Sequence, residues 1–161
     1  NWVDPNNTLP NKSSILTWNG STFNAATKVL GSWTADATIA PGTGFFVYLP
    51  PTQTSNITNT FVGSVIVPSG GSITNTIPSG FSMLGSPIPF AGDLTTDTNL
   101  NIYPLLTVNK SSILTWNGST YNGATLVLGS WSQTAPITVG SGFFVYQKGA
   151  TPTNWIQNAT Y

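Results

Sequence analysis

The chain has 161 residues, enough to bury about two thirds of its unfolded surface without a disulfide or a metal. Only 5% of the residues are charged, as Lys and Asp alone, and the formal net charge is zero. Without Arg the chain cannot build the basic stripe that nucleic acid or an anionic membrane requires, so we expect neither as a partner.

In chain order, the first elements are short strand-forming runs separated by turn residues. Residues 14–23 hold two such runs around Asn19 and Gly20, a pair that predicts a two-residue type I′ turn in which Trp18 pairs with Ser21. Residues 28–33 (KVLGSW) predict a third strand, whose glycine marks a bulge or a close backbone approach. Residues 44–48 (GFFVY) predict a fourth.

The next runs, at 61–67, 72–77 and 80–88, are separated by PSGG and PSG turns. The strand signals of 14–48 then return at 112–146. No stretch of ten residues shows an apolar period of 3.6, and 12 Pro and 16 Gly punctuate the chain. We therefore expect an all-β protein, a β-sandwich or an open barrel with essentially no helix.

An internal repeat of about 98 residues organises the chain. Residues 11–48 align without a gap on 109–146, and 28 of the 38 pairs are identical. Residues 61–98 have no counterpart before residue 1. The sequence thus predicts an incomplete unit, the back half only, at 1–58 and a complete unit with a C-terminal connecting strand at 59–161.

Three explanations of the half unit stay open. The chain is a piece of a longer tandem array, or its first unit borrows the missing strands from a neighbour, or the half unit packs on the whole one as a pseudo-dimer.

The segments GFSMLGSPIPFAGDL, ILTWNGSTY and ITVGSGFFVY resemble a tandem β-repeat found in large bacterial secreted and cell-surface proteins. The likeness covers about residues 61 to 158, and the back half again near the start of the chain. It implies an exported, modular β-domain. The family has no settled activity and no catalytic residues to carry over.

The residue types for catalysis are nearly absent. The chain has no His and no Cys, and its side-chain carboxylates are Asp4, Asp36, Asp93 and Asp97. In the repeat, Ile102 replaces Asp4 and Thr134 replaces Asp36. We expect no enzymatic activity and no cofactor.

Oxygen ligands at alternate positions give one weak metal signal, for Ca²⁺, at Asp93, Asp97, Asn99 and Asn101. This run lacks the glycine and the distal Glu of an EF-hand loop, so we interpret it as an Asx-rich turn and predict no metal site.

Most aromatic residues repeat in register and are expected in the core, including Trp18, Trp33, Trp116 and Trp131, with the Phe pairs at 45–46 and 143–144. The chain ends supply a predicted assembly interface, formed by Trp2, Trp155, Ile156 and Tyr161.

Seven N-x-S/T sequons are potential glycosylation sites: Asn6, Asn11, Asn19, Asn56, Asn109, Asn117 and Asn158.

Together these features predict an extracellular or cell-surface location and a structural role. The chain would be a subunit of a fibre, sheath or surface layer, joined to its own copies head to tail, with strand donation completing the half unit. The alternative is an adhesin or carbohydrate-binding module that recognises surface glycans.

Overall fold

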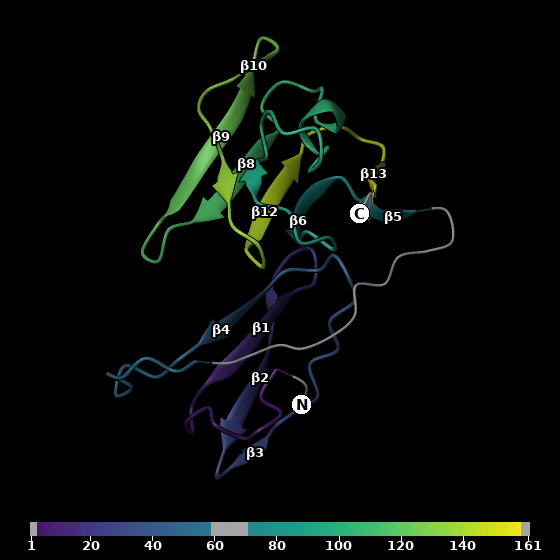
Figure 1. Ribbon diagram of the computed structural model, residues 1–161. Helices are drawn as coiled ribbons and strands as arrows, with labels where there is room; N and C mark the ends of the chain where they lie inside the picture. Colours follow the sequence, from purple (N-terminus) through teal and green to yellow (C-terminus); the bar gives the residue numbers. More distant parts are fainter. Residues whose placement is uncertain (1–2, 59–70, 159–161) are drawn as a thin grey trace. The chain divides into compact units, whose positions relative to one another are not determined.

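The computed structural model in Figure 1 describes residues 3–58 and 71–158. These residues form antiparallel β-sheets and one short 3-10 helix, so the expected all-β class is confirmed. Residues 3–40 and 45–58 make a first compact unit, and residues 41–44 and 71–158 make a second. None of the described residues forms a helix long and apolar enough to span a membrane. The predicted strand at 61–67 lies outside the described residues.

The first unit is a single four-stranded sheet. Its strands are β1 (Ser14–Trp18), β2 (Phe23–Val29), β3 (Ser32–Trp33) and β4 (Phe45–Tyr48). In space they follow the order β3-β2-β1-β4. Alternation along β1 and β2 places Ile15 opposite Ala26 on one face, and both side chains are buried.

The predicted two-residue turn at Asn19 and Gly20 is wrong. Trp18 pairs with Phe23, so four residues form the loop, and the register differs by two positions from the predicted one. The Asn19 side chain causes the difference, because its Oδ1 accepts hydrogen bonds from the backbone amides of Ser21 and Thr22 at 3.0 and 2.9 Å. The shift is even, so Trp18 and Phe23 still share a face, with ring centroids 5.0 Å apart.

A two-residue turn lies instead inside the segment predicted as a third strand. Val29 pairs with Ser32, and the residues between them, Leu30 and Gly31, have φ of 49° and 82°. Positive φ at both central positions is what a type I′ turn requires. The segment 28–33 is therefore the tip of the β2-β3 hairpin, and the same geometry returns at Leu128 and Gly129.

The second unit contains the same strands with further ones added. Its elements are β5 (Ser72–Ile77), β6 (Gly80–Gly85), β7 (Gly92–Asp93), η1 (Tyr103–Leu105), β8 (Ser112–Trp116), β9 (Tyr121–Val127), β10 (Ser130–Trp131), β11 (Pro136–Ile137), β12 (Gly142–Gln147) and β13 (Thr153–Asn158). The main sheet has the order β10-β9-β8-β12-β6. Strands β13 and β5 form a separate pair, as do β11 and β7.

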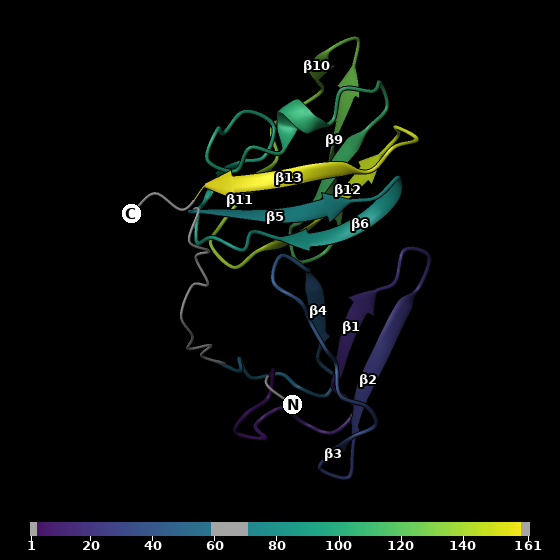
Figure 2. The same cartoon turned by 90° about the vertical axis from the view of Figure 1, so that its right-hand side faces the viewer.

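The core of the second unit lies between its main sheet and the β13-β5 pair, which run side by side in Figure 2. Trp155 of β13 is fully buried, and its ring meets that of Phe143 of β12 at 5.9 Å. The Trp155 indole donates a hydrogen bond to the carbonyl of Leu100 at 2.6 Å. Two layers with an apolar interior correspond to the sandwich expectation, and the described sheets do not close into a barrel.

A short segment from the middle of the chain also belongs to the second unit. Thr43 pairs with Leu84 of β6, Gly44 donates a backbone hydrogen bond to Met83, and Gly85 donates one to Gly42. The approach is close, because a Cβ added to Gly44 would lie 2.6 Å from the Leu84 carbonyl oxygen. At Gly142, the counterpart of Gly44 in the repeat, the same distance would be 3.6 Å.

This difference predicts that Gly44→Ala disturbs the chain and Gly142→Ala does not. Overpacking against a backbone carbonyl costs about 1–3 kcal/mol, whereas a contact at 3.6 Å is ordinary. We expect the Gly85 amide to lose protection from hydrogen exchange in Gly44→Ala and to keep it in Gly142→Ala. Equal protection in both variants would contradict the pairing.

Candidate functional site

The two units differ most at the end of the shared sheet. Strands β1, β2 and β3 correspond to β8, β9 and β10, each 98 positions later, and β4 corresponds to the middle of β12. In the second unit the sheet continues past β12 to β6, with six residue pairs from Gly142↔Gly85 to Gln147↔Gly80. In the first unit, the described part of the sheet ends at β4.

The same sequence, FFVY, therefore has two environments. Val145 of β12 is fully buried, whereas Val47 at the matching position of β4 is 40% exposed. Tyr48 is 49% exposed. Val47 lies opposite the buried Ile15, on the face that forms the core in the second unit, so this face is buried at Ile15 and exposed at Val47.

The two units also differ in the number of buried apolar residues. Of the buried apolar residues in the described chain, four belong to the first unit and seventeen to the second. Some of the additional ones come from strands that the first unit does not share, such as Ile77 of β5 and Trp155 of β13. Others, such as Phe143 and Val145, lie in the shared strands at positions whose counterparts in the first unit are half-buried or exposed.

The backbone of β4 presents hydrogen-bonding groups on its outer side. Met83 and Gly85 direct their backbone bonds toward residues 42–44, so Ser82 and Leu84 must face β12. Their partners, Val145 and Phe143, therefore point their amides and carbonyls at β6. By the same register, Val47 of the first unit points its amide and carbonyl away from β1. We call this side of β4, along Phe45–Tyr48, the outer edge.

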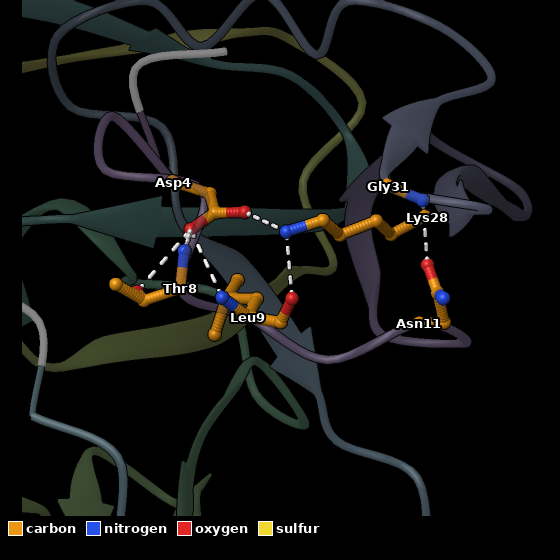
Figure 3. Close-up of polar contacts among 6 residues, drawn as sticks. All are labelled: Asp4, Thr8, Leu9, Asn11, Lys28 and Gly31. Carbon is orange, nitrogen blue, oxygen red and sulfur yellow. Dashed lines mark hydrogen bonds and ion pairs between the residues drawn. The ribbon is translucent and has the colours of Figure 1, made fainter.

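A buried ion pair fixes the N-terminal segment to strand β2 of the first sheet (Figure 3). The Lys28 Nζ lies 2.8 Å from Asp4 Oδ2 and donates a second bond, of 2.6 Å, to the Leu9 carbonyl. Asp4 Oδ1 accepts the backbone amides of Thr8 and Leu9 at 2.7 and 3.1 Å. Both charged side chains are nearly inaccessible to solvent, at 0% and 3%.

In the second unit both positions of this ion pair are apolar. Ile102 stands in place of Asp4 and Leu126 in place of Lys28, and both are buried. The first unit thus has a hydrogen-bonded charge pair where the second has two buried apolar side chains, and this pair stabilises the segment only while both charges are present.

Electrostatics favour the charged form of this pair. Burial raises the pKa of Asp4, but the hydrogen bond from Lys28 and those from the Leu9 and Thr8 amides outweigh it, so the pKa lies below its ordinary value of 3.8. A depressed carboxyl pKa stabilises the fold above that ordinary value, and the contribution is lost as the pH falls through the folded-state pKa.

In the predicted Asx-rich turn at 93–101, the polar side chains make hydrogen bonds to other groups of the same chain. Asp93 Oδ1 accepts the amides of Thr95 and Ala135, and Asp97 Oδ1 accepts the amides of Asn99 and Leu100. Asn101 donates to the Ile156 carbonyl. Burial raises the pKa of Asp93, and the bonds from Ala135 and Thr95 lower it further than burial raises it. Within 3–58 and 71–158, no three residues of the types Asp, Glu, His and Cys gather in one place.

The predicted terminal interface is divided by the fold. Trp155 is core, as described above, while its neighbour Ile156 is 43% exposed. Trp2 and Tyr161 lie outside the described residues. The sequence signal could not distinguish these roles, because the alternation of β13 that buries one residue exposes the next.

The aromatic residues expected in the core also fall into three groups. Phe143 and Phe144 are buried, as predicted. Trp116 is 45% exposed, with its ring tilted by 60° to that of Tyr121 at 4.9 Å. The remaining residues of the set are half-buried: Trp18, Trp33, Phe45, Phe46 and Trp131.

All seven sequon asparagines lie in exposed positions: Asn6, Asn11, Asn19, Asn56, Asn109, Asn117 and Asn158. The side chains of Asn19 and Asn117 already hold their loops, and Asn11 Oδ1 accepts the Gly31 amide.

A groove on the second unit was missed by the sequence analysis. It has a volume of about 700 Å³ and lies between the η1 turn and the β9-β10 hairpin, with Tyr103 and Trp131 among its walls. Thr95, Thr96 and Ser130 also line it, and no charged residue is among its lining residues.

Comparison with known proteins gives no relative. No family model, no curated protein and no solved structure matches this chain.

The ion pair generates a prediction for the first unit. Lys28→Leu alone leaves the Asp4 carboxylate buried without its cation, and we expect it to lower the free energy of unfolding by about 3–5 kcal/mol. The double variant Asp4→Ile, Lys28→Leu, which copies the second unit, should recover part of that loss. Urea unfolding measures both.

The pH dependence supplies the control. The wild-type first unit should lose stability as the pH falls below about 4, and the double variant should lose less over the same range. If the losses of stability in Asp4→Ile and Lys28→Leu simply add in the double variant, and if the double variant loses as much stability at low pH as the wild type does, the two charges are not coupled.

Proposed function

We propose that this chain is a structural subunit of an extracellular assembly, a fibre, sheath or surface layer, whose copies join through the incomplete first unit. The observation that carries the proposal is the contrast between β12 and β4: Val145 is covered and Val47 is 40% exposed in strands of the same sequence. An uncovered apolar edge is a template for pairing with another chain.

Composition supports this role. With charges on only 5% of the residues, the surface depends on Ser, Thr and Asn for its hydration. Such a surface gives little charge repulsion between copies and therefore favours close association. The extracellular location rests on this composition and on the resemblance to secreted tandem repeats.

Head-to-tail joining is one form that the joint can take. In that form, a neighbouring copy donates strands equivalent to β5 and β6, and these complete the first unit as β6 completes the second. A contact between unlike surfaces that does not close on itself produces a filament.

Association in solution tests the proposal. The full chain should associate as its concentration rises, in analytical ultracentrifugation and in electron micrographs, because uncovered apolar surface is buried at the joint. Val47→Lys should keep the chain monomeric, since a lysine on a sheet edge opposes pairing. Val127→Lys, at a valine of β9 that is 53% exposed, should associate as the wild type does. A folded wild-type chain that stays monomeric at millimolar concentration would refute the assembly role.

A second function, glycan binding, is favoured by the groove beside Tyr103 and Trp131. Aromatic rings with neighbouring hydroxyl groups and no charge suit a neutral sugar chain. Neutral oligosaccharides should then shift the tryptophan fluorescence, and Trp131→Phe should abolish the shift, while Trp33→Phe in the first unit should keep it. No response across a broad panel would remove this candidate.

A further inference from the structure

The first unit contains a small pocket that neither the proposed joint at β4 nor the groove of the second unit uses. It has a volume of about 230 Å³ and lies between strands β1 and β2 and residues 35–38. We infer that this pocket binds an extended segment of a partner chain in which an aspartate is followed by a leucine, as in residues 92–95 of this chain. This inference goes beyond the proposed function, because it does not require copies of the chain to associate.

The second unit shows which segment lies beside the equivalent residues. Ala135 corresponds to Ala37, a lining residue of the pocket. The Ala135 amide donates a hydrogen bond of 3.0 Å to Asp93 Oδ1, and the Ala135 carbonyl accepts one of 3.0 Å from the Leu94 amide. Leu94 is fully buried, in the core cluster that also contains Ala135. One short segment therefore binds both backbone polar groups of Ala135 and adds an apolar side chain to the core.

In the first unit, Ala37 lacks these contacts. Residues 61–98, which include the Asp-Leu segment, have no counterpart in the first unit. Within the described part of the chain, neither the amide nor the carbonyl of Ala37 makes a hydrogen bond. Ala37 is half-buried, whereas Ala135 is 1% exposed. Polar backbone groups in a partly buried position favour the binding of a segment that supplies their hydrogen-bond partners.

Two apolar residues of the pocket are the same in both units. Ile15 and Ala26 line the pocket, and the second unit has the same residue types at Ile113 and Ala124. All four are buried. An extended segment that adds to a sheet obtains affinity from main-chain hydrogen bonds and specificity from side chains that enter pockets. The partner's leucine would enter beside Ile15 and Ala26, and its aspartate would accept the Ala37 amide.

One residue of the pocket opposes an acidic partner. Asp36 takes the place of Thr134 in the repeat, and it is exposed. Two carboxylates that lie close together repel each other, but salt screens the repulsion between exposed charges. We therefore expect Asp36 to weaken binding at low salt without preventing it.

A second copy of this chain is a poor source of the segment. Its own residues 92–93 pair with β11, and its Leu94 is buried in its own core. Moving the segment to another chain would break the same kinds of contact that the new site forms, with no gain. The partner is therefore an Asp-Leu segment that is not already engaged in a complete unit of this kind.

A synthetic peptide of residues 86–98, added to the full-length wild-type chain in dilute solution, tests the site directly. As the peptide concentration rises, the Ala37 amide signal should shift in NMR spectra, and its hydrogen should exchange more slowly. The Ala135 amide should not change, because Asp93 already accepts its hydrogen bond.

Substitutions in the peptide identify the contacts without affecting the fold of the chain. Peptides with Asp93→Ala or Leu94→Ala should bind about tenfold more weakly, because each loses one of the two side-chain contacts. A peptide with Thr98→Ala is the matched control and should bind as the unmodified peptide does, since Thr98 is exposed in the second unit. In the chain, Asp36→Thr copies the second unit and should tighten binding at low salt.

A covalent form repeats the test at a high effective concentration of the segment. In this form, residues 61–98 are joined directly to residue 1, just as they precede residue 99 in the second unit. The Ala37 amide should then exchange as slowly as the Ala135 amide. Leu94→Ala in the added segment alone should make Ala37 exchange fast again.

The outcomes decide the inference separately from the proposed function. Protection of Ala37 in either form, lost with the Leu94→Ala segment, supports the inference. An Ala37 amide that stays fast in both forms overturns it, and so does protection that survives both Asp93→Ala and Leu94→Ala. Equal affinity of wild type and Asp36→Thr for the peptide at low salt would place the peptide elsewhere and also overturn it. None of these results depends on whether the wild-type chain associates with its own copies.

Discussion

A β-sheet with one apolar face is stable only when a second layer covers that face, and this constraint governs the whole chain. The second unit satisfies it, because β13 and β5 cover the main sheet and Trp155 fills the space against Phe143. The first unit contains the same sheet without these strands among its described residues. Of the 38 residues at 11–48, 28 are identical to their counterparts at 109–146, so the difference in burial between Val47 and Val145 does not come from the strand sequence.

The first unit compensates for this deficit at one end only. The ion pair between Asp4 and Lys28 holds the N-terminal segment against β2, with every charged atom hydrogen-bonded. At the other end, β4 keeps an apolar strand at the margin of the sheet. The charge pair lies at β2 and does not cover β4, where Val47 is 40% exposed.

Much of the fold could be predicted from the sequence, because strand runs and turn residues are local signals. The all-β class and the strands at 14–18, 45–48 and 142–147 follow from them. The turns were harder: the Asn19 side chain bonds enlarge one loop, and Leu30 adopts the positive φ that the sequence assigned to Asn19. For the candidate site at β4, the only signal in the sequence was that residues 61–98 have no counterpart in the first unit. The ion pair joins residues 24 positions apart, and the walls of the groove at Trp131 come from separate segments of the chain. No local sequence pattern could therefore reveal either.

Hydrogen exchange at Val47, with Val145 as an internal reference, tests the central claim most directly. Both amides belong to the same short sequence, and only Val145 faces a described partner strand, β6. Val145 should exchange slowly at every protein concentration, while Val47 should exchange fast in dilute solution and slow down as the chains associate. A Val47 amide that is as slow as Val145 in dilute solution, or that stays fast in assembled material, would contradict the view that the outer edge of β4 is the joint.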